Sequence, residues 1–213
     1  MFGITFLLEI VALLTGIILL KQISPNSYKL IVLLLALTVV NEGLSHYGGY
    51  KEIGVSKVYF YNLFFLIEFL FVGIIYFPVI KSKRIYILIA ISCLSLLFLL
   101  LRESGLGIMN PDYISVICLG LVFFSVYYLL ELIYRDVIVN VKSDPLFFFS
   151  IGLIAAQLLL FFYINAKRVD SFRNDAYAIE IFRVFNLAGN VIYYLSICYS
   201  FLCTLIFPKQ DGI

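Results

Sequence analysis

The stretch VYFYNLFFLIEFLFVGIIYFPVI, residues 58–80, decides the fold class, because it stays apolar for long enough to cross a membrane. At about 1.5 Å per residue, a helix of this length spans the roughly 30 Å hydrocarbon core of a bilayer. Its polar residues are Asn62, three tyrosines and Glu68, which lies near its middle. A charged group at that depth costs on the order of 3 kcal/mol to insert, so Glu68 is expected to face protein or water.

The composition of the whole chain also indicates a membrane-spanning protein. Of its 213 residues, 63% are hydrophobic and 13% are charged, and the mean hydropathy is +1.08. Soluble domains carry about 25% charged residues, and a soluble fold could not hide this much apolar surface. The net charge of +2 gives no indication of nucleic-acid binding. We therefore predict an integral membrane protein whose residues 1–213 form a single transmembrane domain.

Seven apolar segments follow one another along the chain, and each is predicted to be a transmembrane helix. They cover about residues 4–20, 28–47, 58–80, 85–101, 113–134, 146–166 and 181–207. Ser24-Pro25, Asn110-Pro111 and Asp144-Pro145 each place a capping side chain before a proline suited to the first helical position. Asn174 or Asp175 is the candidate cap of the last helix, which would then begin before its apolar part. The sequence therefore predicts an all-α polytopic membrane protein, a bundle of seven transmembrane helices.

Lysine and arginine residues in the loops indicate the orientation of this bundle. The odd-numbered loops and the C-terminal tail carry eight, which are Lys21, Lys29, Lys81, Lys83, Arg84, Arg135, Lys142 and Lys209. The even-numbered loops carry six, which are Lys51, Lys57, Arg102, Lys167, Arg168 and Arg173. Because basic loops stay in the cytoplasm, the excess favours an outside N-terminus and a cytoplasmic C-terminus. The predicted location is the cell membrane, as a multi-pass protein of a bacterial inner membrane.

The polar residues inside these segments gather towards one end of the predicted bundle. The candidate ligand-binding residues are Glu9, Glu42, His46, Asn62, Glu68, Gln157, Arg183, Asn186 and Asn190. All of them lie at the midplane or near the loops that join helices two to three, four to five and six to seven. Arg183, Asn186 and Asn190 follow the spacing of one helical stripe, and Glu42 and His46 are four residues apart. This pattern predicts a polar cavity open to one face, which the predicted orientation places outside.

The charge balance in this region needs an explanation. Glu9, Glu42 and Glu68 face only Arg183 and His46, so at least one carboxyl group is protonated or is neutralised by a bound cation. Two other interpretations stay open. The polar groups hold the bundle together by hydrogen bonds between helices, or Arg183 extends outwards or pairs with Glu180.

No sequence motif indicates a particular chemistry. The chain has no HExxH, GxSxG or P-loop pattern, so enzymatic activity is uncertain and is not favoured. Glu42 and His46 alone are too weak a pattern to predict a metal site, and no cofactor is expected. Two pairs of small residues, Ala12 with Gly16 and Gly152 with Ala156, are instead typical of helices that approach closely.

Two neighbouring stretches carry a resemblance to a known group of proteins. The pattern NEGLSHY at residues 41–47, followed by YFYNLFFLIEFLF at residues 59–71, resembles small uncharacterised seven-helix membrane proteins of Bacteroidota type. The composition, rich in Phe, Tyr, Ile and Leu, is similar as well. The resemblance implies no established activity, and it makes Asn62 and Glu68 the matching polar positions.

Three functional hypotheses follow from these observations. The leading one is a receptor-like sensor or binding component for a small molecule, lipid headgroup or cation, which signals to a protein partner. Glu68, Glu42 and Arg183 are its expected ligand contacts. The second is a proton- or cation-coupled transporter with Glu68 as the carrier, which requires access from both faces. The third is a membrane scaffold whose buried polar groups only fix the packing.

Overall fold

The computed structural model describes residues 2–20, 26–48, 56–134, 141–169, 172 and 175–207. These residues form helices and no strand, which confirms the all-α fold class. The helices are α1 (Phe2–Leu19), α2 (Asn26–His46), α4 (Lys57–Tyr76), α5 (Lys83–Ser104), α6 (Pro111–Ile133), the 3₁₀ helix η1 (Val141–Ser143), α7 (Pro145–Ala166) and α9 (Ala176–Ile206). Six described helices, α2, α4, α5, α6, α7 and α9, are long and apolar enough to cross a membrane, and α1 is a shorter apolar helix.

Two of the predicted helix starts are confirmed by their capping bonds. The Asn110 side chain accepts hydrogen bonds from the backbone N–H groups of Asp112, at 2.9 Å, and Tyr113, at 3.4 Å. The Asp144 side chain accepts one from the N–H of Leu146, at 3.0 Å. Each such cap contributes about 1 kcal/mol to helix stability. The third predicted start, Ser24-Pro25, lies outside the described residues.

Two helix bounds differ from the predicted ones by four residues or more. The third predicted segment extends to Ile80, but α4 ends at Tyr76, because Pro78 has no N–H to continue the helical hydrogen bonds. The seventh apolar segment begins at residue 181, and α9 begins at Ala176, which confirms that the helix starts before its apolar part. The Asp175 side chain caps it by accepting from the N–H groups of Tyr177 and Ala178, so its polar first turn is also helical.

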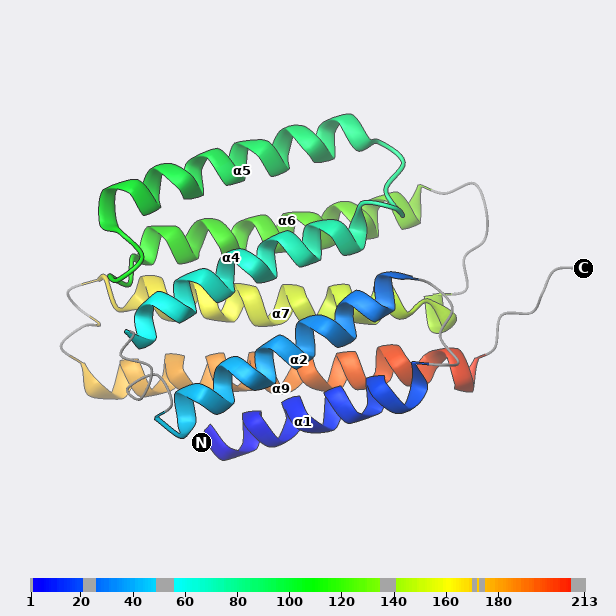
Figure 1. The fold of residues 1–213 in the computed structure, drawn as a ribbon, viewed down its shortest axis with the longest axis horizontal. Helices are drawn as coiled ribbons and strands as arrows, with labels where there is room; N and C mark the ends of the chain where they lie inside the picture. Colours follow the sequence, from blue (N-terminus) through cyan, green and yellow to red (C-terminus); the bar gives the residue numbers. More distant parts are fainter. Residues whose placement is uncertain are drawn as a thin grey trace, which may run out of the picture.

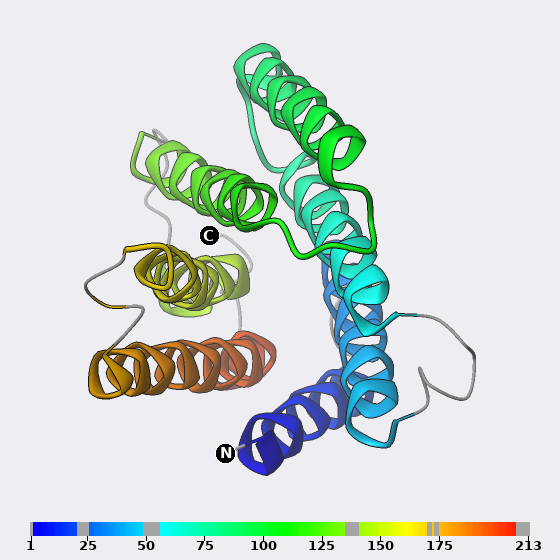
Figure 2. The ribbon, with the colours of Figure 1, turned by 90° about the vertical axis from the view of Figure 1, so that its left-hand side faces the viewer.

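Six of the helices form a closed ring. Helices α1, α2, α4, α6, α7 and α9 contact one another in that order, and α9 contacts α1. Seen along the bundle in Figure 2, α2, α4 and α5 form one layer and α6, α7 and α9 form the other, with α1 bridging the two at one edge. Helix α5 packs against α6 outside the ring and lies at the edge of the bundle in Figure 1.

Small residues let the neighbouring helices of the ring approach closely, as the two predicted pairs indicated. A Cβ atom at Gly152 of α7 would lie 2.6 Å from the Cβ of Ser196 and 3.2 Å from the Cα of Tyr193, both on α9. A Cβ atom at Gly16 of α1 would lie 2.8 Å from a methyl carbon of Val32 on α2. Because real Cβ atoms do not come this near, glycine is required at both contacts.

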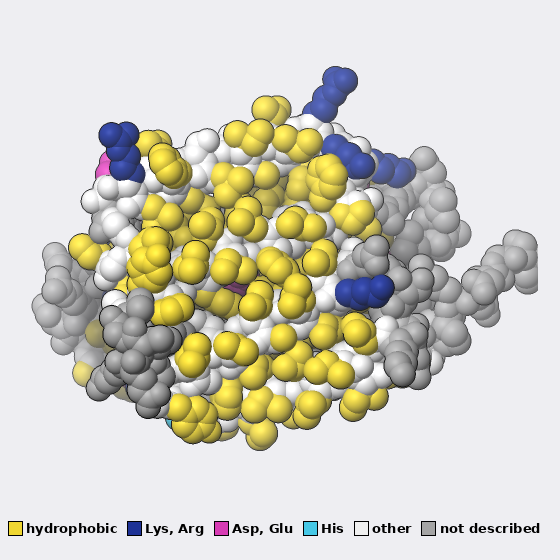
Figure 3. Space-filling model, viewed as in Figure 1, with side chains coloured by type: hydrophobic (Ala, Val, Ile, Leu, Met, Phe, Trp, Pro, Cys, Tyr) yellow, Lys and Arg dark blue, Asp and Glu magenta, His cyan; other side chains and the backbone are white. Residues whose placement is uncertain are grey.

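The outer surface of the bundle is apolar at mid-helix. Ile91 of α5 is 56% exposed and Leu119 of α6 is 49% exposed, and each lies near the middle of its helix. In Figure 3 apolar side chains cover the middle of the visible face, and lysine and arginine side chains lie towards its two ends. Such a surface is unfavourable in water and favourable in hydrocarbon. Together with the six long apolar helices, it indicates a multi-pass membrane protein.

Candidate functional site

The ring of helices encloses a cavity of about 510 Å³. Its wall contains seven of the predicted site residues, which are Glu9, Glu42, Glu68, Gln157, Arg183, Asn186 and Asn190. They come from five helices, α1, α2, α4, α7 and α9, and Met109 in the α5–α6 connection adds to the wall. The cavity lies towards the end where α4 and α9 begin and α2 and α7 end, which is the left-hand end in Figure 1.

Glu68 lies on the buried face of α4 and is 7% exposed. Its Oε1 atom accepts a hydrogen bond from Nε2 of Gln157 on α7, at 3.3 Å. Gln157 is itself 5% exposed, and its Oε1 atom is buried without a hydrogen-bond partner among the described residues. The two side chains are therefore hydrogen-bonded to each other in the cavity wall. Oε1 of Gln157 is left as an unsatisfied acceptor.

The other two carboxyl groups of the cavity come from α1 and α2. Glu9 is 4% exposed, and its Oε2 atom has no hydrogen-bond partner among the described residues. Tyr194 of α9 lines the same cavity as Glu9. Glu42 accepts a hydrogen bond from the hydroxyl group of Tyr61 on α4, at 2.9 Å. Three helices thus direct carboxyl groups into one space.

The basic side chains of the cavity are exposed and lie at its rim. Nη1 of Arg183 is 3.3 Å from Oε2 of Glu180, and both side chains are about half exposed. This is the outward ion pair that the sequence offered as an alternative for Arg183. Nζ of Lys57 lies 5.5 Å from the centre of the Tyr61 ring. Within the described residues, no salt bridge reaches a carboxyl group of the cavity.

Two predicted site residues do not line the cavity. The exposed His46 stacks against Phe6, with ring centres 6.3 Å apart. Asn62 is fully buried, and its Nδ2 donates to the backbone carbonyl groups of Leu106 and Ile108, at 2.9 Å each. Asn62 therefore ties the α5–α6 connection to α4, beside the cavity wall.

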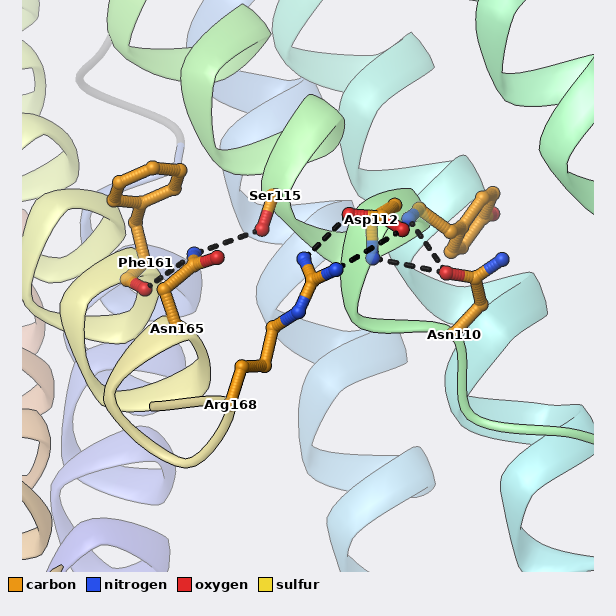
Figure 4. Close-up of polar contacts among 7 residues, drawn as sticks. Asn110, Asp112, Ser115, Phe161, Asn165 and Arg168 are labelled. Carbon is orange, nitrogen blue, oxygen red and sulfur yellow. Dashed lines mark hydrogen bonds and ion pairs between the residues drawn. The ribbon is translucent and has the colours of Figure 1, made fainter. Parts of the chain in front are cut away.

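A polar clamp joins the end of α7 to the start of α6 near the same end of the bundle (Figure 4). The guanidinium group of Arg168 forms an ion pair with the carboxylate of Asp112. Nδ2 of Asn165 donates to Oγ of Ser115 and to the backbone carbonyl of Phe161, at 2.9 Å each. These contacts hold two neighbouring helices of the ring together.

The Asp112→Asn variant is expected to keep nearly all of its stability. The side chains of Arg168 and Asp112 are 46% and 54% exposed, and exposed ion pairs contribute about 1 kcal/mol or less. Thermal unfolding of the purified protein in detergent checks this expectation. A large fall in melting temperature would show that the ion pair, and not the neighbouring hydrogen bond of Asn165, contributes most of the stability of this contact between α6 and α7.

The opposite half of the bundle is filled by hydroxyl side chains that are bonded to one another. The hydroxyl group of Tyr76 lies 2.7 Å from Oγ of Ser150 and 3.3 Å from Oγ of Ser125. The hydroxyl group of Tyr128 donates to Asp144, at 2.6 Å. All of these side chains except Asp144 are buried, so these hydroxyl groups are satisfied by protein, whereas the buried Oγ of Ser200 on α9 has no partner among the described residues.

Sequence reasoning missed some residues of the cavity wall. Lys57 was counted only as a loop residue, and Tyr194 was not among the candidates. The helical stripe that contains Asn186 and Asn190 continues to position 194, four residues after Asn190, so its periodicity indicates Tyr194 as well. No comparable signal indicates Met109, because it lies in a connection whose path the sequence does not define.

Comparisons of the chain with protein-family models, with curated proteins and with solved structures found no match. The resemblance to seven-helix proteins of Bacteroidota type therefore stays a hypothesis.

Proposed function

We propose that this chain is a multi-pass protein of the cell membrane whose polar cavity binds a small ligand and reports its presence to a protein partner. All seven described helices, including α1, cross the membrane in this proposal. The N-terminus lies outside, so the cavity opens outwards. The observation that carries the proposal is the buried pair of Glu68 and Gln157, which faces a cavity of ligand size beside Glu9. Binding pockets commonly measure about 300 to 1,000 Å³.

The energetics of burial favour a ligand over a purely structural role. Carboxyl groups within a membrane bundle are costly and usually mark a site or a pathway. A structural network satisfies its polar atoms internally, as the Tyr76 cluster does. By contrast, the acceptors Oε2 of Glu9 and Oε1 of Gln157 are buried without partners among the described residues. A bound molecule that donates hydrogen bonds would satisfy both acceptors.

The filled opposite half favours binding over transport. A transporter with Glu68 as carrier needs a path from the cavity to the second face. The buried cluster of Tyr76, Ser125 and Ser150 occupies the ring interior on that side. A ligand could instead act by displacing Gln157 from Glu68, which would change the contact between α4 and α7 and alter what these helices present to a partner.

The Glu68→Gln variant is expected to lose a ligand that the wild-type protein retains. The substitution keeps the size of the side chain and its contact with Gln157, but removes the charge that a ligand would recognise. Native mass spectrometry of both proteins measures the loss as a missing bound mass. The matched control is Glu103→Gln, an exposed carboxyl group at the end of α5 outside the cavity wall.

Two outcomes of this comparison, and one of a separate flux assay in sealed vesicles, are informative. A bound mass seen with the wild type and the control, but absent from Glu68→Gln, supports the proposal. The same bare chain in all three proteins would favour the scaffold. Flux across sealed vesicles that depends on Glu68 would favour the transporter.

A further inference from the structure

We propose that the ligand of this cavity carries an amine with N–H groups, a primary or secondary ammonium, held between Glu68, Glu9 and Gln157. This inference rests on the proposed function and specifies its ligand. The shared chemistry is the ammonium group, whether it belongs to a free amine or to the headgroup of an aminolipid.

The excess of carboxyl groups is the first reason. The described residues form two salt bridges, Arg168 with Asp112 and Arg183 with Glu180, and neither involves Glu9 or Glu68. Within the described part of the chain, the hydrogen bond that Glu42 accepts comes from the hydroxyl group of Tyr61. A cationic ligand would neutralise Glu9 and Glu68, which form no ion pair among the described residues, whereas Lys57 and Arg183 lie at the exposed rim.

The kind of unsatisfied atom is the second reason. Both orphan atoms of the cavity wall, Oε2 of Glu9 and Oε1 of Gln157, are acceptors. A ligand must donate hydrogen bonds to satisfy them. An ammonium group supplies up to three N–H donors together with a positive charge, and bonds between charged partners are about twice as strong as neutral ones.

The aromatic part of the wall is the third reason. Tyr61, Phe64, Phe65, Tyr193 and Tyr194 all line the cavity beside the carboxyl groups. The negative faces of aromatic rings attract organic cations, and this attraction is stronger where water is excluded. These rings also offer apolar surface to the carbon atoms that an amine carries and a metal ion lacks.

The spread of the carboxyl groups disfavours a bare metal ion. Among the described residues, no three His, Cys, Asp or Glu side chains lie close enough together to hold one. A divalent cation needs several oxygen ligands within about 2 to 2.6 Å. A cavity of about 510 Å³ is far larger than one ion and suits a molecule of several carbon atoms.

Thermal stabilisation of the purified protein in detergent tests the proposal. The amine probes are methylammonium, butylammonium and phenethylammonium chloride. The matched probes are neutral 2-phenylethanol, the anion phenylacetate, trimethyl(2-phenylethyl)ammonium, which lacks N–H groups, and magnesium chloride. We expect at least one primary amine to raise the melting temperature with increasing concentration, as a ligand of the folded state does. The matched probes should have little effect.

Three variants locate the effect. Glu68→Gln is expected to weaken the apparent amine affinity about tenfold or more, and Glu9→Gln should act in the same direction. Because each variant is tested on its own, Glu9→Gln keeps the test informative if Glu68→Gln does not fold. Glu103→Gln should respond like the wild type, since it alters an exposed carboxyl group outside the cavity wall.

The outcomes separate this inference from the proposed function. Stabilisation by 2-phenylethanol or phenylacetate that depends on Glu68 would overturn the claim that the ligand is an amine. The proposal that the cavity is a binding site would still stand. An equal response to the trimethylammonium probe would overturn the requirement for N–H groups. No response to any probe, with no retained mass on the wild-type protein, would overturn both.

Lipid nanodiscs distinguish the two sources of the amine. If the ligand is a lipid headgroup, discs of phosphatidylethanolamine should stabilise the wild type over discs of phosphatidylglycerol, and Glu68→Gln should remove the difference. If it is a free amine, the soluble probes should act equally in both kinds of disc. Either result supports an ammonium in the cavity. No stabilisation by amines or by phosphatidylethanolamine would overturn it.

Discussion

The Gly152→Ala variant is expected to lose a large part of the stability of the bundle. The added Cβ atom would lie 2.6 Å from the Cβ of Ser196 and 3.2 Å from the backbone Cα of Tyr193. Relief requires α7 and α9 to separate, because the second contact is with backbone and no rotamer change removes it. Overpacking of this kind costs about 1 to 3 kcal/mol. The expected result is a clear fall in melting temperature in detergent.

A second glycine provides the matched control for this substitution. A Cβ atom at Gly73, in the last turn of α4, would lie 3.6 Å from the nearest atoms, which is an ordinary van der Waals distance. Gly73→Ala should therefore be neutral, or stabilising by up to about 1 kcal/mol through its helix propensity. An equal fall for both variants would mean that the close contact between α7 and α9 does not determine the effect.

The Asn62→Leu variant is expected to release the α5–α6 connection from α4. The backbone carbonyl groups of Leu106 and Ile108 would lose their donor. Both bonds are partly buried, and the loss of each costs about 0.5 to 1.5 kcal/mol. The melting temperature should fall, and limited proteolysis should cut the connection around residues 105–110 faster than in the wild type.

The control for Asn62→Leu is the same substitution at Asn186. The Asn186 side chain lines the cavity and makes no hydrogen bond to another described residue. Asn186→Leu should therefore leave the melting temperature and the rate of proteolysis nearly unchanged. If it destabilises the protein as much as Asn62→Leu does, loss of the two carbonyl bonds is not the cause.

Helix positions follow from the sequence because their signals are local. Asn110 and Asp144 cap α6 and α7 through bonds to residues two or three positions away. The grouping of Glu9, Glu68 and Gln157 could also be predicted, because depth in a membrane follows from the distance to a segment end. The bounds of α4 were less accurate, since Pro78 ends the helix inside an apolar run.

Contacts between distant segments could not be predicted in the same way. The partners of Asn62 are backbone carbonyl groups 44 and 46 positions away, in a connection without regular structure. Asn62 was grouped with the site residues because it lies near the same end of its apolar segment. A residue that holds a connection in place would lie at the same depth, so the sequence does not distinguish the two roles. The order of helices around the ring was also not predictable, because hydropathy defines each helix but not its neighbours. The place of α5 outside the ring agrees with its lack of a polar residue larger than serine at mid-helix.

Cysteine labelling tests most directly whether a water-filled polar cavity opens at one face of the membrane. Asn190→Cys places a thiol in the cavity wall, and Ser125→Cys places one in the filled half. A charged, membrane-impermeant thiol reagent is applied to intact bacterial cells, with the wild-type chain as the blank for its native cysteines. We predict that the reagent labels Asn190→Cys from outside and does not label Ser125→Cys. Labelling of Asn190→Cys only in inverted vesicles would contradict the outward opening, and no labelling from either face would contradict the cavity itself.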